Sequence, residues 1–139
     1  MRTGLRPEDL GDFLDQPVIA VLATRRPDDT ILLSPVWFEW RDGGANVWVP
    51  SPGNAKIRDI ARDPRVSLVI ASQEWPYRGL EIRSEARVSP EGFDDLVGRT
   101  ATRYMGADAA KRMVGTMPDG VVVRIEPGTL RAWDYEDEV

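Results

Sequence analysis

The stretch best suited to chemistry is "SPGNAKIRDIARD", in which Lys56 lies one turn into a short predicted helix. Gly53 frees the backbone, Asn54 offers an N-cap oxygen, and Ile57 and Ile60 fall on one helix face. Because a helix start exposes unpaired N–H groups and about half a positive charge, a lysine beside it favours an anionic ligand. The alternative is a solvated surface lysine, which this position destabilises by about 0.3–1 kcal/mol. These residues alone leave both readings open.

The chain contains no histidine and no cysteine. The first absence removes the commonest general base and the commonest metal and haem ligand, and the second removes disulfides and thiolate chemistry. We therefore expect no metal site, and the sequence singles out no catalytic side chain. An enzyme with this composition would depend on a bound cofactor for its chemistry, as hydride-transfer enzymes do.

Length and composition indicate one ordinary globular domain over residues 1–139, with 42% hydrophobic and 29% charged residues. A net charge of -5 argues against nucleic-acid binding, because phosphate backbones attract basic proteins. The N-terminus lacks the apolar run of a signal peptide, and no stretch reaches the ~20 apolar residues of a membrane helix. We expect a cytoplasmic protein that binds neither membrane nor nucleic acid.

Alternating and β-branched runs predict a mainly β (α+β) antiparallel fold. Strands are predicted at 18–25, 31–40, 45–50, 65–72, 80–88, 120–127 and 129–135. Helices are predicted within 1–16, around Lys56, from Pro90 toward Met105, and after Gly106. Six or seven short strands with helices between them indicate a small closed or nearly closed barrel with peripheral helices. The acidic tail, 134–139, is expected to be solvated and mobile.

The order of five segments along the chain carries a resemblance. They are "FLDQPVIAVLATRRPDDTILLSPVWFEW", "VWVPSPGNAKIRDIARDPRVSLVI", "YRGLEIRSEARV", "TRYMG" and "VVVRIEPGTLRAWDY". Together they resemble the pyridoxamine 5′-phosphate oxidase-like split-barrel family, and most closely its branch that binds the deazaflavin coenzyme F-420. The resemblance implies a homodimer of six-stranded antiparallel split β-barrels of the FMN-binding type, with two cofactor sites shared between the protomers.

The resemblance also implies which residues would meet the cofactor. A strand would lie against the ring, a segment with Lys56 and Asp59 would bind the phosphate with help from Ser51, and aromatic and basic residues would complete the site. These expected cofactor-binding residues are Ser34, Pro35, Val36, Trp37, Ser51, Lys56, Asp59, Tyr77, Arg78 and Trp133. Asp59 stands where the family usually has asparagine, and its charge would repel a phosphate by about 1 kcal/mol if it faced one.

Several of these residues also have purely structural readings. Ser34 and Pro35 suit an edge strand or a bulge, because proline has no backbone N–H to donate to a neighbouring strand. Tyr77 and Arg78, with the nearby Trp75, suit a dimer interface as well as a ligand groove.

The function implied is hydride transfer from reduced coenzyme F-420 to a small, planar, electrophilic substrate such as an enone or quinone. Two alternatives remain: an oxidoreductase of the same fold that uses FMN, and a carrier of flavin or deazaflavin without turnover. Oxidation of pyridoxamine phosphate itself is less favoured, because only Arg124 and Arg131 supply basic side chains toward the C-terminal end. The sequence does not identify the natural substrate.

Overall fold

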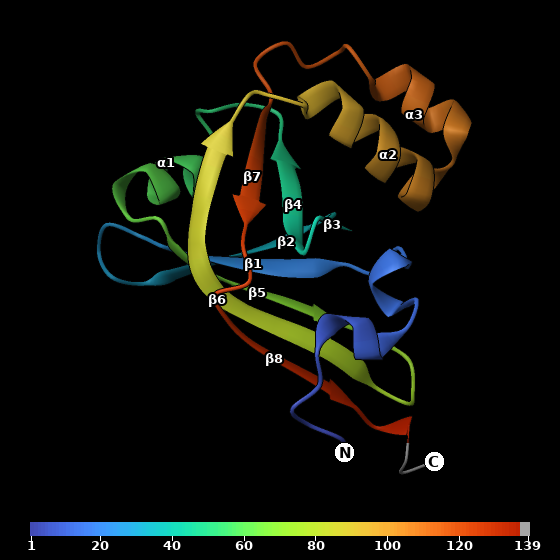
Figure 1. Ribbon diagram of the computed structural model, residues 1–139. Coiled ribbons are helices and arrows are strands. Elements are labelled where there is room, and N and C mark those ends of the chain that lie inside the picture. Colours follow the sequence, from blue (N-terminus) through green and yellow to red (C-terminus); the bar gives the residue numbers. More distant parts are fainter. Residues whose placement is uncertain (137–139) are drawn as a thin grey trace.

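Eight antiparallel strands curl into a half-barrel in the computed structural model, which describes residues 1–136 (Figure 1). The strands are β1 Ala20–Arg25, β2 Ile31–Val36, β3 Glu39–Arg41, β4 Gly44–Val49, β5 Arg65–Ala71, β6 Arg78–Ser89, β7 Val121–Ile125 and β8 Thr129–Asp134. Their order is β2-β1-β5-β6-β7-β4-β3, with β8 also paired to β6. This arrangement confirms the predicted split β-barrel with peripheral helices, with eight strands in place of the six expected.

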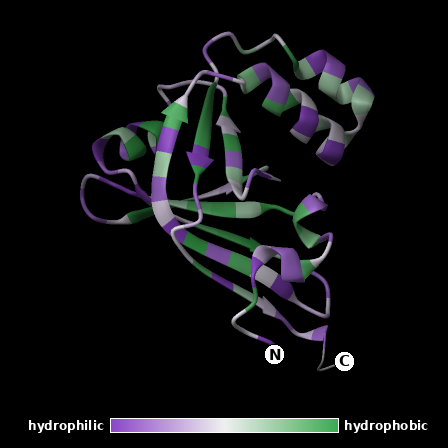
Figure 2. Ribbon diagram, viewed as in Figure 1, coloured by the Kyte–Doolittle hydropathy of each residue, from purple (hydrophilic) through white to green (hydrophobic). Residues whose placement is uncertain are grey.

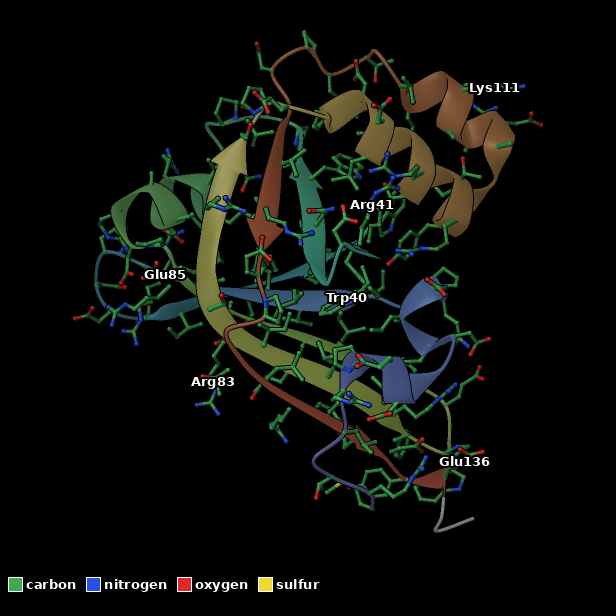
Figure 3. All side chains as sticks on the ribbon, viewed as in Figure 1. Trp40, Arg41, Arg83, Glu85, Lys111 and Glu136 are labelled. Carbon is green, nitrogen blue, oxygen red and sulfur yellow. The ribbon has the colours of Figure 1, made fainter. Side chains whose placement is uncertain are left out.

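The long strand β6 joins the two halves of the barrel. Its first part pairs with β5 and β8, and its last residues pair with β7. Leu80, Ile82 and Ala86 are buried as the alternation predicts, while Arg83 and Glu85 project from the outer face (Figure 3). One strand therefore contributes to the core of both halves.

Helices close the barrel and flank it. Two 3₁₀ helices, η1 Pro7–Leu10 and η2 Phe13–Asp15, precede β1, and the α-helices are α1 Ala55–Arg62, α2 Phe93–Met105 and α3 Ala107–Met113. The apolar side chains of α1, Ile57 and Ile60, join the same core cluster as Phe13. The helices α2 and α3 form a pair beside β4 and β7 (Figure 1), and their apolar and polar residues alternate along them (Figure 2). Within residues 1–136, no helix has the length and apolar character needed to cross a bilayer.

Two predicted elements near the N-terminal half differ from the structure. The helix predicted within 1–16 is two short 3₁₀ helices, because Gly11 takes a left-handed conformation with φ 64° and ends the first one. The strand predicted over 31–40 is broken, since β2 ends at Val36 and Trp37 and Phe38 turn before β3 begins.

The predicted acidic tail also differs, at its first residue. Asp134 is buried at the end of β8, where its carboxylate lies 2.7 Å from the Arg2 guanidinium. Residues 137–139 lie outside the described part of the chain, so the expectation of a mobile tail stays a prediction for them.

Candidate functional site

An apolar groove with a volume of about 350 Å³ opens where β2, β4 and α1 come together. Its lining consists of apolar residues and a single charged one: Ile19, Pro35, Val36, Trp37, Trp48, Val49, Pro50 and Lys56. We call it the tryptophan groove. Small-molecule sites typically have volumes of about 300–1,000 Å³ and mostly apolar walls with few polar groups. This lining therefore suits a flat apolar ring that carries an anionic group.

Lys56 lies at the start of α1, as predicted. Asn54 caps this helix, and its side-chain oxygen accepts hydrogen bonds of 3.1 Å from both the backbone N–H and the ammonium of Lys56. Burial lowers the pKa of the Lys56 ammonium. Among residues 1–136, no carboxylate forms an ion pair with it. A half-buried cation without a counter-charge is stabilised by an anion, and charge-assisted hydrogen bonds make phosphate a strong partner.

Asp59 lies on the same helix, but its carboxylate contacts residues outside the tryptophan groove. Its carboxylate is buried, accepts a hydrogen bond of 3.1 Å from the Thr24 hydroxyl, and lies 3.7 Å from Arg26 and 3.5 Å from Arg62. None of these partners lines the tryptophan groove. The repulsion expected if Asp59 faced a phosphate at Lys56 therefore has no basis in this arrangement.

Replacing Asp59 with asparagine tests this placement. We expect the free energy of unfolding to fall by about 1–3 kcal/mol, because a buried hydrogen-bonded charge is lost. Since Arg26 and Arg62 are partly exposed, the lower part of this range is favoured. FMN titration measures anion binding at Lys56, and we expect it to show no gain in affinity for this variant. Asp63→Asn is the matched control, and a clear gain in affinity for Asp59→Asn would show that the carboxylate acts on the groove.

The indole rings of Trp37 and Trp48 line the groove with their planes at 78° to each other. The ring of Trp37 stacks on Tyr104 with centroids 4.8 Å apart and planes at 5°, and it meets Trp48 edge-on at 6.0 Å. The indole N–H of Trp48 donates a hydrogen bond of 2.9 Å to the Thr100 hydroxyl. Both rings are thus held by α2.

Tyr104 is a positioning residue that the sequence did not reveal. Its hydroxyl donates a hydrogen bond of 2.6 Å to the Val18 carbonyl and accepts one of 3.3 Å from the Phe38 N–H. Burial raises the pKa of Tyr104, so the phenol stays protonated and can donate its hydrogen bond to the Val18 carbonyl. Helix α2 is thereby tied to the segments before β1 and after β2, which lead directly into groove residues.

Removing only this hydroxyl should loosen the groove. We expect Tyr104→Phe to lower the free energy of unfolding by about 1–3 kcal/mol, because the part-buried Val18 carbonyl and Phe38 N–H lose their partner while the stacked ring remains. Thermal unfolding measures the loss, and the indole NMR signal of Trp37 reports the change in its surroundings. Tyr77→Phe, at an exposed tyrosine, is the control and should change neither.

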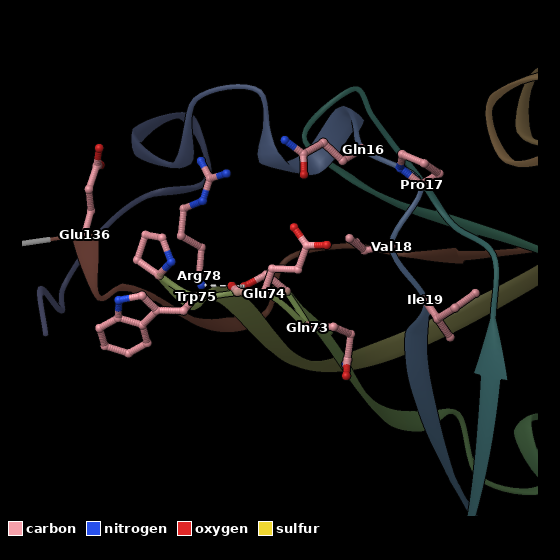
Figure 4. A pocket seen from close by; sticks show the side chains of 11 residues that line it. Gln16, Pro17, Val18, Ile19, Gln73, Glu74, Trp75, Arg78 and Glu136 are labelled. Carbon is pink, nitrogen blue, oxygen red and sulfur yellow. Dashed lines mark hydrogen bonds between the residues drawn. The ribbon is translucent and has the colours of Figure 1, made fainter. Parts of the chain in front are cut away.

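Figure 4 shows a second cavity, of about 730 Å³, which shares Ile19 with the tryptophan groove. It lies between the segment that leads into β1 and the loop from β5 to β6, and Ile19 lines both hollows. We call it the loop cavity, and its lining residues are Gln16, Pro17, Val18, Ile19, Ser72, Gln73, Glu74, Trp75, Pro76, Arg78 and Glu136.

The residues expected to bind a cofactor are thus only partly brought together. Pro35, Val36, Trp37 and Lys56 line the tryptophan groove, and Arg78 lines the loop cavity. Ser34, Ser51, Asp59, Tyr77 and Trp133 line neither. The Ser51 hydroxyl accepts a hydrogen bond of 3.1 Å from the Gly53 N–H and so closes the turn before α1.

Three of the outlying residues have structural surroundings of their own. Ser34 pairs with Leu22 in the ladder between β1 and β2, and Pro35 lies on this edge strand, as its missing N–H permits. Tyr77 meets Trp75 edge-on at 5.2 Å. Trp133 covers Gly79, where an added Cβ would lie 2.3 Å from the indole, so only glycine fits beneath that ring.

Comparison with known proteins assigns the architecture. The family described as pyridoxamine 5′-phosphate oxidase matches residues 7–134. A conserved hypothetical protein from Mycobacterium tuberculosis has a similar structure, with a TM-score of 0.82, 27% identity, and coverage of 96% of this chain and 88% of that one. An F-420 reductase is also similar, with a TM-score of 0.73, 25% identity, and coverage of 86% of this chain and 93% of the other.

Other matches are more distant. A heme storage protein from Vibrio cholerae has a TM-score of 0.68 at 18% identity, over 91% of this chain and 94% of that one, which indicates a shared fold alone. No curated protein matches the sequence. Within residues 1–136, no group of carboxylates is arranged to hold a metal ion.

Proposed function

The chain belongs to the pyridoxamine 5′-phosphate oxidase family, and on this basis we propose that it is an oxidoreductase that uses the deazaflavin coenzyme F-420. The observation that carries the proposal is the half-buried Lys56 ammonium, without a carboxylate partner in residues 1–136, in an apolar groove that the flat Trp37 ring also lines. The similarity to an F-420 reductase supports the choice of cofactor.

In this proposal each part of the tryptophan groove has a role. The cofactor ring lies against Pro35, Val36 and the indole of Trp37, and its phosphate binds the Lys56 ammonium near the start of α1. When bound, the coenzyme supplies the hydride that reduces an electrophilic substrate. The protein binds and orients the ring and keeps water from it with apolar walls. Lys56 is the only titratable residue in this lining, so the proposal assigns no catalytic side chain.

FMN is the second candidate cofactor, because one ammonium and a flat apolar wall suit either tricyclic ring. A carrier without turnover is the third possibility, since the groove supplies no acid or base apart from Lys56. Titrating the purified protein with F-420 and with FMN, each followed by fluorescence, ranks the cofactors. Tighter binding of FMN would replace F-420 in the proposal. Oxidation of reduced F-420 by a soluble quinone then separates an enzyme from a carrier.

We also propose that the active form is a homodimer. On the outer side of edge strand β2, Ile31 is 51% exposed, Leu33 is 64% exposed, and Pro35 is exposed as well. Ile19, beside them at the groove, is 48% exposed. Large apolar side chains gathered on one face mark interaction surfaces. A second copy that covers this face would border the tryptophan groove and contribute to the cofactor site.

A further inference from the structure

Arg78 holds a positive charge in the loop cavity without a matching negative one. Its guanidinium donates a hydrogen bond of 3.3 Å to the Leu10 carbonyl and lies over the Phe13 ring, 5.2 Å from the centroid. Among residues 1–136, no carboxylate forms an ion pair with it. The side chain is half-buried and borders the cavity together with Trp75 and Pro76 (Figure 4). A guanidinium fixed in this way is already oriented for a ligand carboxylate, which it can bind through two N–H groups.

The rest of the loop cavity suits a flat apolar body. Pro17, Val18 and Ile19 form one wall, and Trp75 and Pro76 form part of the other. A volume of about 730 Å³ lies well within the range of small-molecule sites. Because Ile19 also lines the tryptophan groove, the end of a ligand opposite Arg78 would lie next to the proposed cofactor.

Two carboxylates border the same cavity and must be weighed against Arg78. Glu136 lies 3.7 Å from Arg2, which also pairs with Asp134, and its side chain is 71% exposed, so water screens most of its charge. Glu74 is exposed and forms no ion pair among residues 1–136. Water screens an exposed carboxylate, whereas the half-buried guanidinium gains more from a counter-charge in its lower-dielectric surroundings. The balance favours an anionic group at Arg78 over a cationic one at Glu74.

We propose that the loop cavity is the acceptor subsite and that it takes flat organic carboxylates. The carboxylate binds the Arg78 guanidinium, and the conjugated body lies between the apolar walls and extends toward Ile19. The role of the bound carboxylate as a hydride acceptor rests on the proposed function, because it requires a reduced cofactor in the tryptophan groove. Recognition of a carboxylate by Arg78 does not depend on that assumption.

The test uses two flat probes of nearly equal shape, trans-cinnamate and the uncharged trans-cinnamamide, titrated into the purified protein without cofactor. Binding is followed by calorimetry and by the indole NMR signal of Trp75. We expect cinnamate to bind at least about tenfold more tightly, the lower limit for a hydrogen bond to a charged group. Arg78→Gln should abolish this preference. Glu74→Gln should increase the affinity for cinnamate severalfold and leave that for cinnamamide unchanged.

Arg112→Gln, at an exposed arginine on α3, is the matched control and should bind both probes as the unaltered protein does. If Arg78→Gln does not fold, the comparison of the two probes and the Glu74→Gln variant still test whether the cavity prefers a carboxylate. Equal affinity for the two probes, or tighter binding of the aromatic cation phenethylammonium, would overturn the proposal. If cinnamate binds as expected but neither F-420 nor FMN does, the proposed function fails while the carboxylate site stands.

Discussion

Replacing Lys56 with methionine should weaken F-420 binding by about tenfold to a hundredfold. Methionine keeps the apolar stem that borders the groove, while the ammonium that would meet the phosphate is removed. A hydrogen bond to a charged group contributes about 1.5–3 kcal/mol, which sets the size of the expected loss. Fluorescence titration of F-420 at several salt concentrations measures it. The salt dependence of binding should decrease together with the affinity, because a charge contact has been removed.

The chain offers a natural control for this experiment. Its only other lysine, Lys111, projects from α3 on a different part of the molecule (Figure 3) and lies outside both the tryptophan groove and the loop cavity. Lys111→Met removes the same net charge and should leave F-420 affinity unchanged. The helix should survive in Lys56→Met, because Asn54 still caps the Lys56 backbone N–H. Equal affinities for the two variants would place the phosphate away from α1.

Features set by neighbouring residues could be predicted from the sequence. The cap of α1 by Asn54, the buried face of Ile57 and Ile60, and the alternation along β6 all follow from spacings of two to four residues. A run of such short strands with interspersed helices was enough to indicate a barrel. Four residues of the tryptophan groove, Pro35, Val36, Trp37 and Lys56, were also among those expected from the family resemblance.

Features set by distant residues could not be predicted. Tyr104 acts through Val18 and Phe38, which are 86 and 66 positions away, and Trp48 is fixed by Thr100, which is 52 away. No local pattern marks such pairs. The surroundings of Asp59 could not be predicted for the same reason, because its hydrogen-bond partner Thr24 lies on a strand, 35 positions earlier. Part of the groove lining can therefore be predicted from the sequence, but the long-range contacts that hold the lining in place cannot.

Replacing Leu33 with glutamate should convert the proposed dimer into monomers. Leu33 is 64% exposed on the outer side of an edge strand, so its burial is left to a partner. A twofold interface contains every residue twice, and burying each leucine contributes about 1.5–3 kcal/mol. Losing both leucines weakens the free energy of dimerisation by about 3–6 kcal/mol, which raises the dimer dissociation constant about a hundredfold to ten-thousandfold. The glutamates add the cost of burying two like charges.

Sedimentation velocity over a range of concentrations measures this change, and Met105→Glu is the control. Met105 is 59% exposed at the end of α2, so the control adds the same charge at a comparably exposed apolar site outside β2. The Leu33→Glu monomer should still unfold cooperatively, because Leu33 lies outside the core of its own chain. If the groove is shared, F-420 affinity must fall in parallel with dimerisation. A monomeric Leu33→Glu variant that binds F-420 normally would show that one chain builds the whole site, and an unaltered protein that sediments as a monomer would remove the dimer itself.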